Sequence, residues 1–329
     1  MSRRLGVVGA GAWGTALALK LSATAEVALW ARDPARAEAI RRSGENAAHL
    51  PGHRLPGSVR VTADAGEALA GAEAVLLAAP AQALGAVLAG LAPHWPGAAP
   101  AVICAKGIEA GSLRLPSEIA AAALPGVPLA ALTGPSFAHE VAAGLPAALV
   151  LAAPDGEVRT TLLARLAMAR VRLYGSPDLI GAELGGAAKN VIAIAAGVVE
   201  GLALGENARA ALITRGVAEL ARLIAAEGGR AETAAGLAGL GDLVLTCTGA
   251  ASRNHSLGIR LGAGERLGDI LATSRGVTEG VATAPALVAR AARRGVELPI
   301  AAAVAALLAG EADAATLADR LLARAPREE

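Results

Sequence analysis

Hydrophobic residues in the first half of the chain occur in short aliphatic runs, separated by alanine- and leucine-rich stretches with helical spacing. Runs of this length predict buried strands, and the stretches between them predict helices. The predicted strands are residues 5–8, 26–30, 59–62, 74–78, 101–104, 129–133, 147–152 and 170–174. Strands that alternate with helices in this way predict an α/β domain with a doubly wound, mainly parallel sheet.

Strand-like runs nearly disappear beyond Pro177, and longer helical patterns replace them. The predicted helices are residues 184–204, 209–227, 283–294 and 301–308. We therefore expect two domains, residues 1–184 with the sheet and an all-helical C-terminal domain over residues 185–329. A cleft between them is the expected ligand site.

Composition limits the partners of the chain. The 30 basic and 29 acidic residues leave a net charge of +1, so no basic field attracts nucleic acid or an anionic membrane. Mean hydropathy is +0.50, but no run reaches the roughly 18 unbroken apolar residues of a spanning helix. These features predict a protein without a membrane span and without a nucleic-acid partner.

The N-terminus imitates a secretory signal, because Arg3 and Arg4 precede an apolar stretch that ends in the small residues 23–25. Cleavage there would remove the glycine motif described next, so a cytoplasmic protein is favoured. Two cysteines, Cys104 and Cys247, cannot form a disulfide framework, and this is typical of a reducing compartment.

The sequence Gly-Ala-Gly-Ala-Trp-Gly at residues 9–14 directly follows the first predicted strand and opens the first helix. In this context Gly9 allows a tight turn, Gly11 lets the backbone approach a pyrophosphate, and Gly14 lets the helix pack closely on the sheet. The motif predicts a Rossmann-like domain that binds NAD or NADP. An ordinary tight turn between strand and helix is the alternative.

The end of the second strand bears on the choice of cofactor. Arg32 follows this strand, and a guanidinium there suits the 2′-phosphate of NADP, whereas NAD sites carry an acidic residue. Asp33 is predicted to cap the helix that begins at Pro34, although it could serve NAD instead. Arg32 could also be a solvated loop residue. We expect NADP or NAD, with a preference for NADP.

Only three of the 30 basic residues are lysines, and two of them lie where chemistry is expected. Lys106 follows a buried strand, at the carboxyl end that faces the ligand crevice of a parallel sheet. Lys189 shares a helical face with Asn190 and the small residues Gly186, Ala193 and Gly197, which suits close approach by a ligand. Burial makes a lysine proton transferable, so Lys189 is the first candidate for general acid/base work. The alternative is a lysine that neutralises a carboxylate at the domain interface.

Two further segments carry candidate chemistry. Asp242 lies between a glycine and an aliphatic run, where it could support an ammonium group or cap a helix. Arg253, between Ser252 and Asn254, offers a planar fork with neutral donors, which suits a phosphate, although a loop arginine is the alternative. The five histidines lack metal-ligand spacing, so no metal is expected.

These motifs, in order along nearly the whole chain, resemble those of bacterial NAD(P)-dependent glycerol-3-phosphate dehydrogenase. The matching segments are residues 9–18, 45–51, 106–109, 134–140, 184–194, 239–248, 252–254 and 279–280. The resemblance implies reversible hydride transfer between NAD(P)H and dihydroxyacetone phosphate, giving sn-glycerol 3-phosphate for phospholipid synthesis. It also implies a homodimer.

The resemblance further implies roles for individual residues. Lys189 is the implied proton donor and acceptor, with Lys106 and Asp242 in the same site. To the motif glycines Gly9, Gly11 and Gly14 it adds the implied cofactor contacts Ala12, Trp13, Arg32, Lys106, Ala138, Arg253, Val277 and Glu279. The implied substrate contacts are Lys106, Gly134, Ser136, Lys189, Asp242, Ser252, Arg253 and Asn254.

The chain departs from the family pattern at two places. Residues 46–49 lack the usual basic or aromatic residue after the asparagine, which puts a cofactor contact by His49 in doubt, and residues 79–81 lack a hydroxyl. Two alternatives stay open: another lysine-using reductase, such as a hydroxyacid or ketopantoate reductase, and a regulator that senses NAD(P)H without catalysis.

Overall fold

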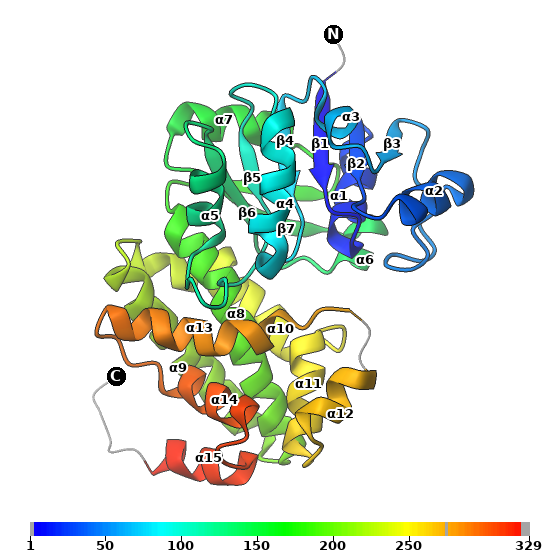
Figure 1. Ribbon diagram of the computed structural model, residues 1–329. Coiled ribbons are helices and arrows are strands. Elements are labelled where there is room, and N and C mark those ends of the chain that lie inside the picture. The colour runs from blue at the N-terminus through cyan, green and yellow to red at the C-terminus, as the bar shows by residue number, and fades with distance from the viewer. Residues whose placement is uncertain (1–2, 274–275, 324–329) are drawn as a thin grey trace. The chain divides into compact units, whose positions relative to one another are not determined.

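The computed structural model describes residues 3–273 and 276–323, and the chain divides into two compact units (Figure 1). The first unit comprises Met1–Lys106 and Arg114–Ala182, and the second comprises Gly107–Leu113 and Glu183–Glu329. The boundary expected from the sequence, at residue 184, places residues 107–113 in the first domain, whereas in the structure they belong to the second unit.

The first unit contains an eight-stranded sheet in the order β3-β2-β1-β4-β5-β6-β7-β8. Its strands are β1 Arg4–Val8, β2 Glu26–Trp30, β3 Val59–Thr62, β4 Ala74–Leu77, β5 Ala101–Ile103, β6 Leu129–Thr133, β7 Ala147–Ala152 and β8 Val171–Ser176. Every neighbouring pair is parallel except β6 and β7. The mainly parallel sheet and its strands are thus confirmed, with ends shifted by at most two residues.

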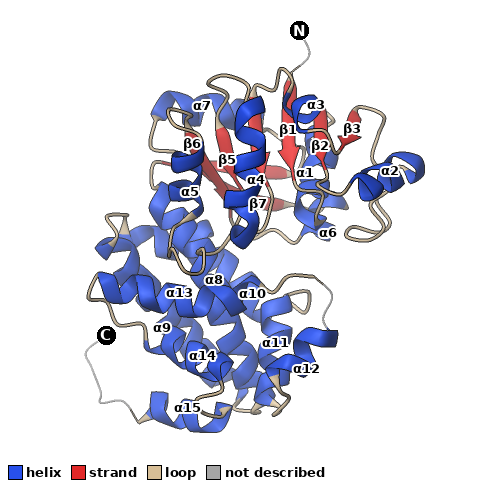
Figure 2. Ribbon diagram, viewed as in Figure 1, coloured by secondary structure: helices blue, strands red, loops and turns tan. Residues whose placement is uncertain are grey.

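Alternating side chains of these strands enter two apolar clusters, which is why the strands read as continuous aliphatic runs. Leu5 and Val7 of β1 enter one cluster, and Val8 enters the other. Helices pack on the sheet (Figure 2). They are α1 Ala12–Leu21, α2 Pro34–Ser43, α3 Ala65–Leu69, α4 Leu84–Leu91, α5 Pro116–Ala123, α6 Ala138–Ala142 and α7 Gly156–Arg165.

The strand order fixes where a ligand can approach this unit. The order reverses between β1 and β4, and doubly wound sheets bind ligands beyond the carboxyl ends of the strands at such a point. The glycine motif follows β1 directly, so the topology places it at this position.

The second unit is helical, and its described residues contain no strand. Its helices are α8 Leu179–Gly201, α9 Gly205–Ala226, α10 Asp242–Thr248, α11 Arg253–Gly262, α12 Leu267–Thr273, α13 Glu279–Arg293, α14 Pro299–Ala309 and α15 Ala314–Leu322. A π-helical turn, Leu237–Gly241, precedes α10. The helical C-terminal domain is confirmed, although α10, α11, α12 and α15 are too short to give a clear periodic pattern.

The start of α8 differs from the prediction. The helix begins at Leu179 rather than Leu184, because the Asp178 carboxylate accepts a hydrogen bond from the backbone N–H of Gly181 at 2.9 Å, as a helix-capping side chain does. α8 is also long and apolar enough to cross a membrane, but 83% of its most apolar window is buried within the folded chain. A core helix of this kind needs no bilayer.

A buried ion pair holds residues 107–113 in the second unit. Arg290 on α13 makes two hydrogen bonds, of 3.0 and 2.9 Å, to the carboxylate of Glu227, and a third, of 2.8 Å, to the carbonyl oxygen of Leu113. Both charged side chains lie in the interior. The forked guanidinium thereby fixes the excursion to helices of this unit.

Candidate functional site

The loop after β1 is shaped by two glycines that cannot be replaced. Gly9 has φ of +108°, and a Cβ there would lie 2.9 Å from the carbonyl oxygen of Ala78. A Cβ on Gly14 would lie 1.9 Å from the carbonyl oxygen of Gly9. Both positions need glycine for backbone packing alone, as the sequence predicts.

Gly11 differs from both, because a Cβ at this position would meet no atom within 4 Å. It is the N-cap of α1, whose first backbone N–H groups have no partner within the helix. Open space beside such donors suits an anion, and a side chain would fill it. Ala12 and Trp13 open the same helix, so the loop fits the pyrophosphate of a dinucleotide.

Asn46 braces this loop, a role that the sequence analysis missed. Its buried amide donates hydrogen bonds to the carbonyl oxygen of Ala10 at 2.9 Å and to Oγ1 of Thr15 at 2.8 Å. Thr15 in turn donates to the carbonyl oxygen of Gly11 at 2.8 Å. The segment 45–51 was recognised as a motif, but nothing in its spacing shows that the asparagine reaches back across 31 residues.

The end of β2 carries the two residues that bear on the choice of cofactor. The Asp33 carboxylate accepts from the backbone N–H of Ala35 at 2.9 Å and caps α2, with Pro34 at the first helical position, as expected. Arg32 is exposed at the carboxyl end of the strand. Because the Asp33 carboxylate is already used as a cap, Arg32 is the better placed of the two to meet a ligand.

A second group of predicted residues meets at the ends of β5 and β6. Lys106 Nζ donates to the carbonyl oxygen of Gly134 at 3.2 Å, and Ser136 Oγ donates to the same oxygen at 3.0 Å. Ala138 begins α6 two residues later. These side chains come together because β5 and β6 are adjacent and parallel, so that their carboxyl ends lie at one edge.

In the second unit, Lys189 on α8 lies against the start of α10. Its Nζ donates to Asp242 Oδ1 at 2.9 Å and to Thr246 Oγ1 at 3.0 Å. The Lys189 side chain is 12% exposed and the Asp242 side chain 1%. A carboxylate at this distance stabilises the ammonium form of the lysine. Thr246, one turn after Asp242, was not singled out from the sequence.

Close approach of two backbones makes this ion pair possible. A Cβ on Gly185 would lie 2.3 Å from the carbonyl oxygen of Ala238, so α8 meets the π-helical turn without an intervening side chain. Lys189 and Asp242 each lie four residues further along. A π-helical turn is an uncommon element and is frequently found at functional sites.

The predicted phosphate-binding segment forms the start of α11. Ser252 is its N-cap and accepts from the backbone N–H of His255 at 3.2 Å. Arg253 is exposed, and its guanidinium lies beside Gly276, where a Cβ would come within 2.6 Å of Nη1. Val277 follows Gly276 directly and Glu279 begins α13 two residues later, so the structure brings these predicted residues into one region.

Asn254 points into the interior of the second unit. Its amide nitrogen donates to Oδ1 of Asn190 at 2.9 Å, and its amide oxygen accepts from the backbone N–H of Gly280 at 3.0 Å. The residue therefore joins α8, α11 and α13, in addition to any contact with substrate.

The small-residue face of α8 was interpreted only in part correctly. Beyond Lys189, the Cβ of a residue at Gly197 would lie 2.1 Å from the carbonyl oxygen of His255, so this part of the face meets α11. The prediction that Gly197 faces a ligand is wrong, because a stripe of small residues permits close packing of a helix as well as of a ligand.

Neither cysteine is an activated nucleophile. Burial raises the pKa of the Cys247 thiol to about 12, although Lys189 and Arg209 act in the opposite direction. Burial likewise raises the pKa of Cys104 to about 12, against the smaller effect of Lys106. Both thiols stay protonated at neutral pH and form no disulfide.

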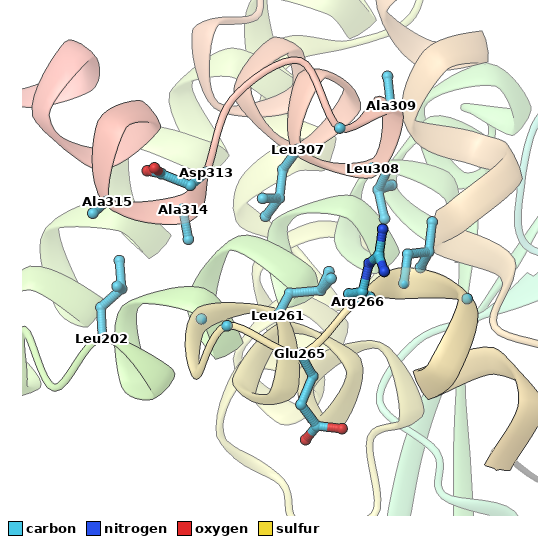
Figure 3. Close-up of a pocket in the computed structure, with 15 residues that line it drawn as sticks. Leu202, Leu261, Glu265, Arg266, Leu307, Leu308, Ala309, Asp313, Ala314 and Ala315 are labelled. Atoms are coloured by element: carbon cyan, nitrogen blue, oxygen red, sulfur yellow. The ribbon is translucent and has the colours of Figure 1, made fainter.

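The second unit contains a cavity of about 510 Å³ (Figure 3). Leu202, Leu261 and Leu307 form part of its wall, with Arg266 and Asp313 among its polar lining, and none of the predicted site residues lines it. Within residues 3–273 and 276–323, no group of His, Cys, Asp and Glu is arranged to hold a metal ion.

The first unit is a doubly wound sheet with a glycine loop after its first strand, and the helical unit holds a buried lysine–aspartate pair. Together these features define the class of nicotinamide dinucleotide oxidoreductases. A model of the family described as "NAD-dependent glycerol-3-phosphate dehydrogenase N-terminus" matches residues 4–159. The corresponding C-terminus model matches residues 178–319. The chain belongs to this family.

Individual relatives agree. Glycerol-3-phosphate dehydrogenase [NAD(P)+] of Rhodospirillum rubrum is 54% identical over 326 residues, which cover 99% of this chain and 93% of the relative. The crystal structure of glycerol-3-phosphate dehydrogenase from Coxiella burnetii matches with a TM-score of 0.94 and 37% identity, covering 98% of this chain and 99% of that chain. A ketopantoate reductase from Ralstonia eutropha matches with a TM-score of 0.61 and 19% identity over 97% of this chain and 99% of that chain, a likeness of fold alone.

The open space at Gly11 predicts how a methyl group added there changes the affinity for NADPH. Gly11→Ala should raise the dissociation constant for NADPH at least about tenfold, because the methyl group occupies the space left for the pyrophosphate. The melting temperature should hardly change, since no atom of the chain is displaced. Fluorescence titration with NADPH and a thermal melt measure both.

Gly57→Ala is the matched control, because a Cβ there also meets no atom within 4 Å. It should leave the affinity for NADPH unchanged. An unchanged affinity in Gly11→Ala would show that the pyrophosphate binds elsewhere.

Proposed function

We propose that this chain reduces dihydroxyacetone phosphate to sn-glycerol 3-phosphate with NAD(P)H, and catalyses the reverse reaction with NAD(P)+. Membership of the glycerol-3-phosphate dehydrogenase family supports the reaction. The contact of Lys189 with Asp242 and Thr246 is the observation that carries the mechanism, because it holds an ammonium group at a fixed place with little exposure to solvent.

The residues of the first unit fit the cofactor. In this proposal Gly9 and Gly14 shape the cofactor-binding loop, and Gly11 with Ala12 and Trp13 holds the pyrophosphate at the start of α1. Arg32 binds the 2′-phosphate of NADP. Exposure of Arg32, and use of Asp33 as a helix cap, support a preference for NADP. The further proposed contacts are Lys106, Ala138, Arg253, Val277 and Glu279.

The proposed substrate site draws on the predicted polar residues. Arg253, with Ser252 and Asn254, binds the phosphate, because a guanidinium makes charge-assisted and often bidentate hydrogen bonds to it. Lys106, Gly134 and Ser136 complete the set, together with Lys189 and Asp242. The hydrogen bonds from Lys106 and Ser136 to Gly134 support joint action of these three.

The bound cofactor supplies the hydride. As negative charge develops on the carbonyl oxygen, the ammonium of Lys189 stabilises it and then donates the proton. In the reverse direction neutral Lys189 removes the hydroxyl proton. Asp242 accepts a hydrogen bond from Nζ and thereby orients the amine, while the phosphate contact with Arg253 positions the ketone.

We also propose that the chain acts in the cytoplasm, as a homodimer, and that its product enters glycerophospholipid synthesis. Two buried cysteines without a disulfide support a reducing compartment. The dimer and the lipid role are supported by the family resemblance.

The reaction is tested by following NADPH absorbance after adding dihydroxyacetone phosphate to the purified protein. Oxidation should proceed with one glycerol 3-phosphate formed for each NADPH consumed. Absence of oxidation with both NADPH and NADH would refute the proposed function. A regulator that only senses NAD(P)H would bind the cofactor without turnover.

Loss of the proposed proton donor should affect chemistry more than binding. Lys189→Met should lower kcat roughly 100-fold or more, the scale of general acid/base catalysis, with the dissociation constant for NADPH nearly unchanged. Steady-state kinetics and fluorescence titration separate these effects.

Two further variants control for folding and for charge. Lys20→Met removes a lysine near the end of α1 and should retain wild-type kcat. Lys189→Met/Asp242→Asn removes the carboxylate that the single variant leaves buried, and should be equally inactive. Near-normal kcat in Lys189→Met would return this lysine to a structural role.

Arg253→Ala tests the phosphate contact. Hydrogen bonds to charged groups contribute about 1.5 to 3 kcal/mol each, so kcat/KM for dihydroxyacetone phosphate should fall on the order of 10- to 100-fold or more. The weak reduction of unphosphorylated dihydroxyacetone should hardly change. NADPH affinity is measured alongside, because Arg253 is also a proposed cofactor contact. Equal losses for both substrates, at unchanged NADPH affinity, would place the phosphate elsewhere.

Arg32→Ser tests the cofactor preference. The variant should weaken binding of NADPH far more than binding of NADH, since only NADPH carries the 2′-phosphate. Arg42→Ser, at the exposed end of α2, should affect neither cofactor. If Arg32→Ser weakens both cofactors equally, the guanidinium does not recognise the 2′-phosphate.

A further inference from the structure

Two helices of the second unit cross with their backbones in contact. A Cβ on Gly197 of α8 would lie 2.1 Å from the carbonyl oxygen of His255, and a Cβ on Gly258 of α11 would lie 2.1 Å from the carbonyl oxygen of Ile194. Real Cβ atoms essentially never come this close to another heavy atom. Glycine is therefore required on both helices at the point of crossing.

The contact continues for one more helical turn. A Cβ on Gly201 would lie 2.3 Å from the carbonyl oxygen of Ile259, and a Cβ on Gly262 would lie 2.7 Å from the carbonyl oxygen of Val198. Each helix thus presents two glycines four residues apart, a spacing that places them on the same face. No side chain separates the helices, so a change of rotamer cannot alter their separation.

A hydrogen bond joins the same two helices nearer the candidate site. Oδ1 of Asn190 on α8 accepts from Nδ2 of Asn254 on α11 at 2.9 Å, and both side chains are buried. Asn190 directly follows Lys189, and Asn254 directly follows Arg253. The bond therefore links the backbone positions of the proposed proton donor and the proposed phosphate ligand.

We infer that the crossing of α8 and α11 is a specificity-determining spacer, which fixes Arg253 at the distance from Lys189 that a three-carbon ketone phosphate spans. This inference rests on the proposed function. In such a substrate the phosphate lies one methylene and one ester oxygen away from the reacting carbonyl group. The glycines and Asn190 act as positioning residues through Lys189 and Arg253.

A methyl group at the crossing should separate the two proposed contacts. Gly258→Ala places a Cβ against the carbonyl oxygen of Ile194, and relief of that contact needs a displacement of about 1 Å, which can cost about 100-fold in rate when a substrate is misplaced. We expect kcat/KM for dihydroxyacetone phosphate to fall between about 10- and 100-fold. Reduction of dihydroxyacetone, which has no phosphate to position, should change less than about twofold.

Two variants cover a failure of Gly258→Ala to fold. Gly262→Ala makes the milder contact, of 2.7 Å, one turn further from Arg253, and should show the same selective loss to a smaller extent. Asn190→Ala removes the hydrogen bond without adding an atom and should act in the same direction. Gly268→Ala, within α12 and with no atom within 4 Å of its Cβ, is the matched control and should match the wild type.

The experiment measures kcat/KM of each variant with both substrates, together with its melting temperature. A loss confined to the phosphorylated substrate supports the spacer. Equal losses with both substrates would overturn the spacer. It would also be overturned if the three variants all behaved like the control Gly268→Ala; these variants are Gly258→Ala, Gly262→Ala and Asn190→Ala. Wild-type protein that fails to reduce dihydroxyacetone phosphate would refute the proposed function itself, and the spacer with it.

Discussion

The ion pair between Lys189 and Asp242 is the interaction on which the candidate site depends. Removing two charges from water is costly, and the cost is offset only when geometry is good and further hydrogen bonds are made. Here the carboxylate is nearly inaccessible, and Thr246 accepts a second hydrogen bond from the ammonium. The pair thus holds the proposed proton donor in one orientation on a helix rather than on a loop.

Gly185 provides the geometry for this pair, and it does so in a different way from Gly11 of the cofactor loop. Gly185 of α8 lies against the backbone of the turn that precedes Asp242, and Gly258 of α11 lies against the backbone of α8. Gly11 has open space instead. A glycine against backbone serves the fold, and a glycine beside open space suits a ligand.

Much of this arrangement could be predicted from the sequence. The buried strands of a parallel sheet leave unmistakable aliphatic runs, and the glycine motif has a fixed place after the first of them. Lys189 stood out because lysine is so rare in this chain. The roles of the predicted site residues remain predictions.

Other features could not be predicted, for physical reasons. Asn46 and Thr246 act through contacts with residues distant in the sequence, which leave no periodic signal. The small-residue face of α8 has the same pattern whether a ligand or a helix covers it, and Gly197 proved to face a helix. The excursion of residues 107–113 depends on Arg290, 177 residues after Leu113.

The most direct test of the account is the pH dependence of kcat for ketone reduction in the wild type and in Asp242→Asn. In the proposed mechanism, reduction needs the ammonium form of Lys189, and the carboxylate of Asp242, 2.9 Å from Nζ, stabilises that form. Its removal favours the neutral amine, so the alkaline fall in kcat should move to lower pH in the variant. An alkaline limb at the same pH in both proteins would contradict a proton donor held by Asp242.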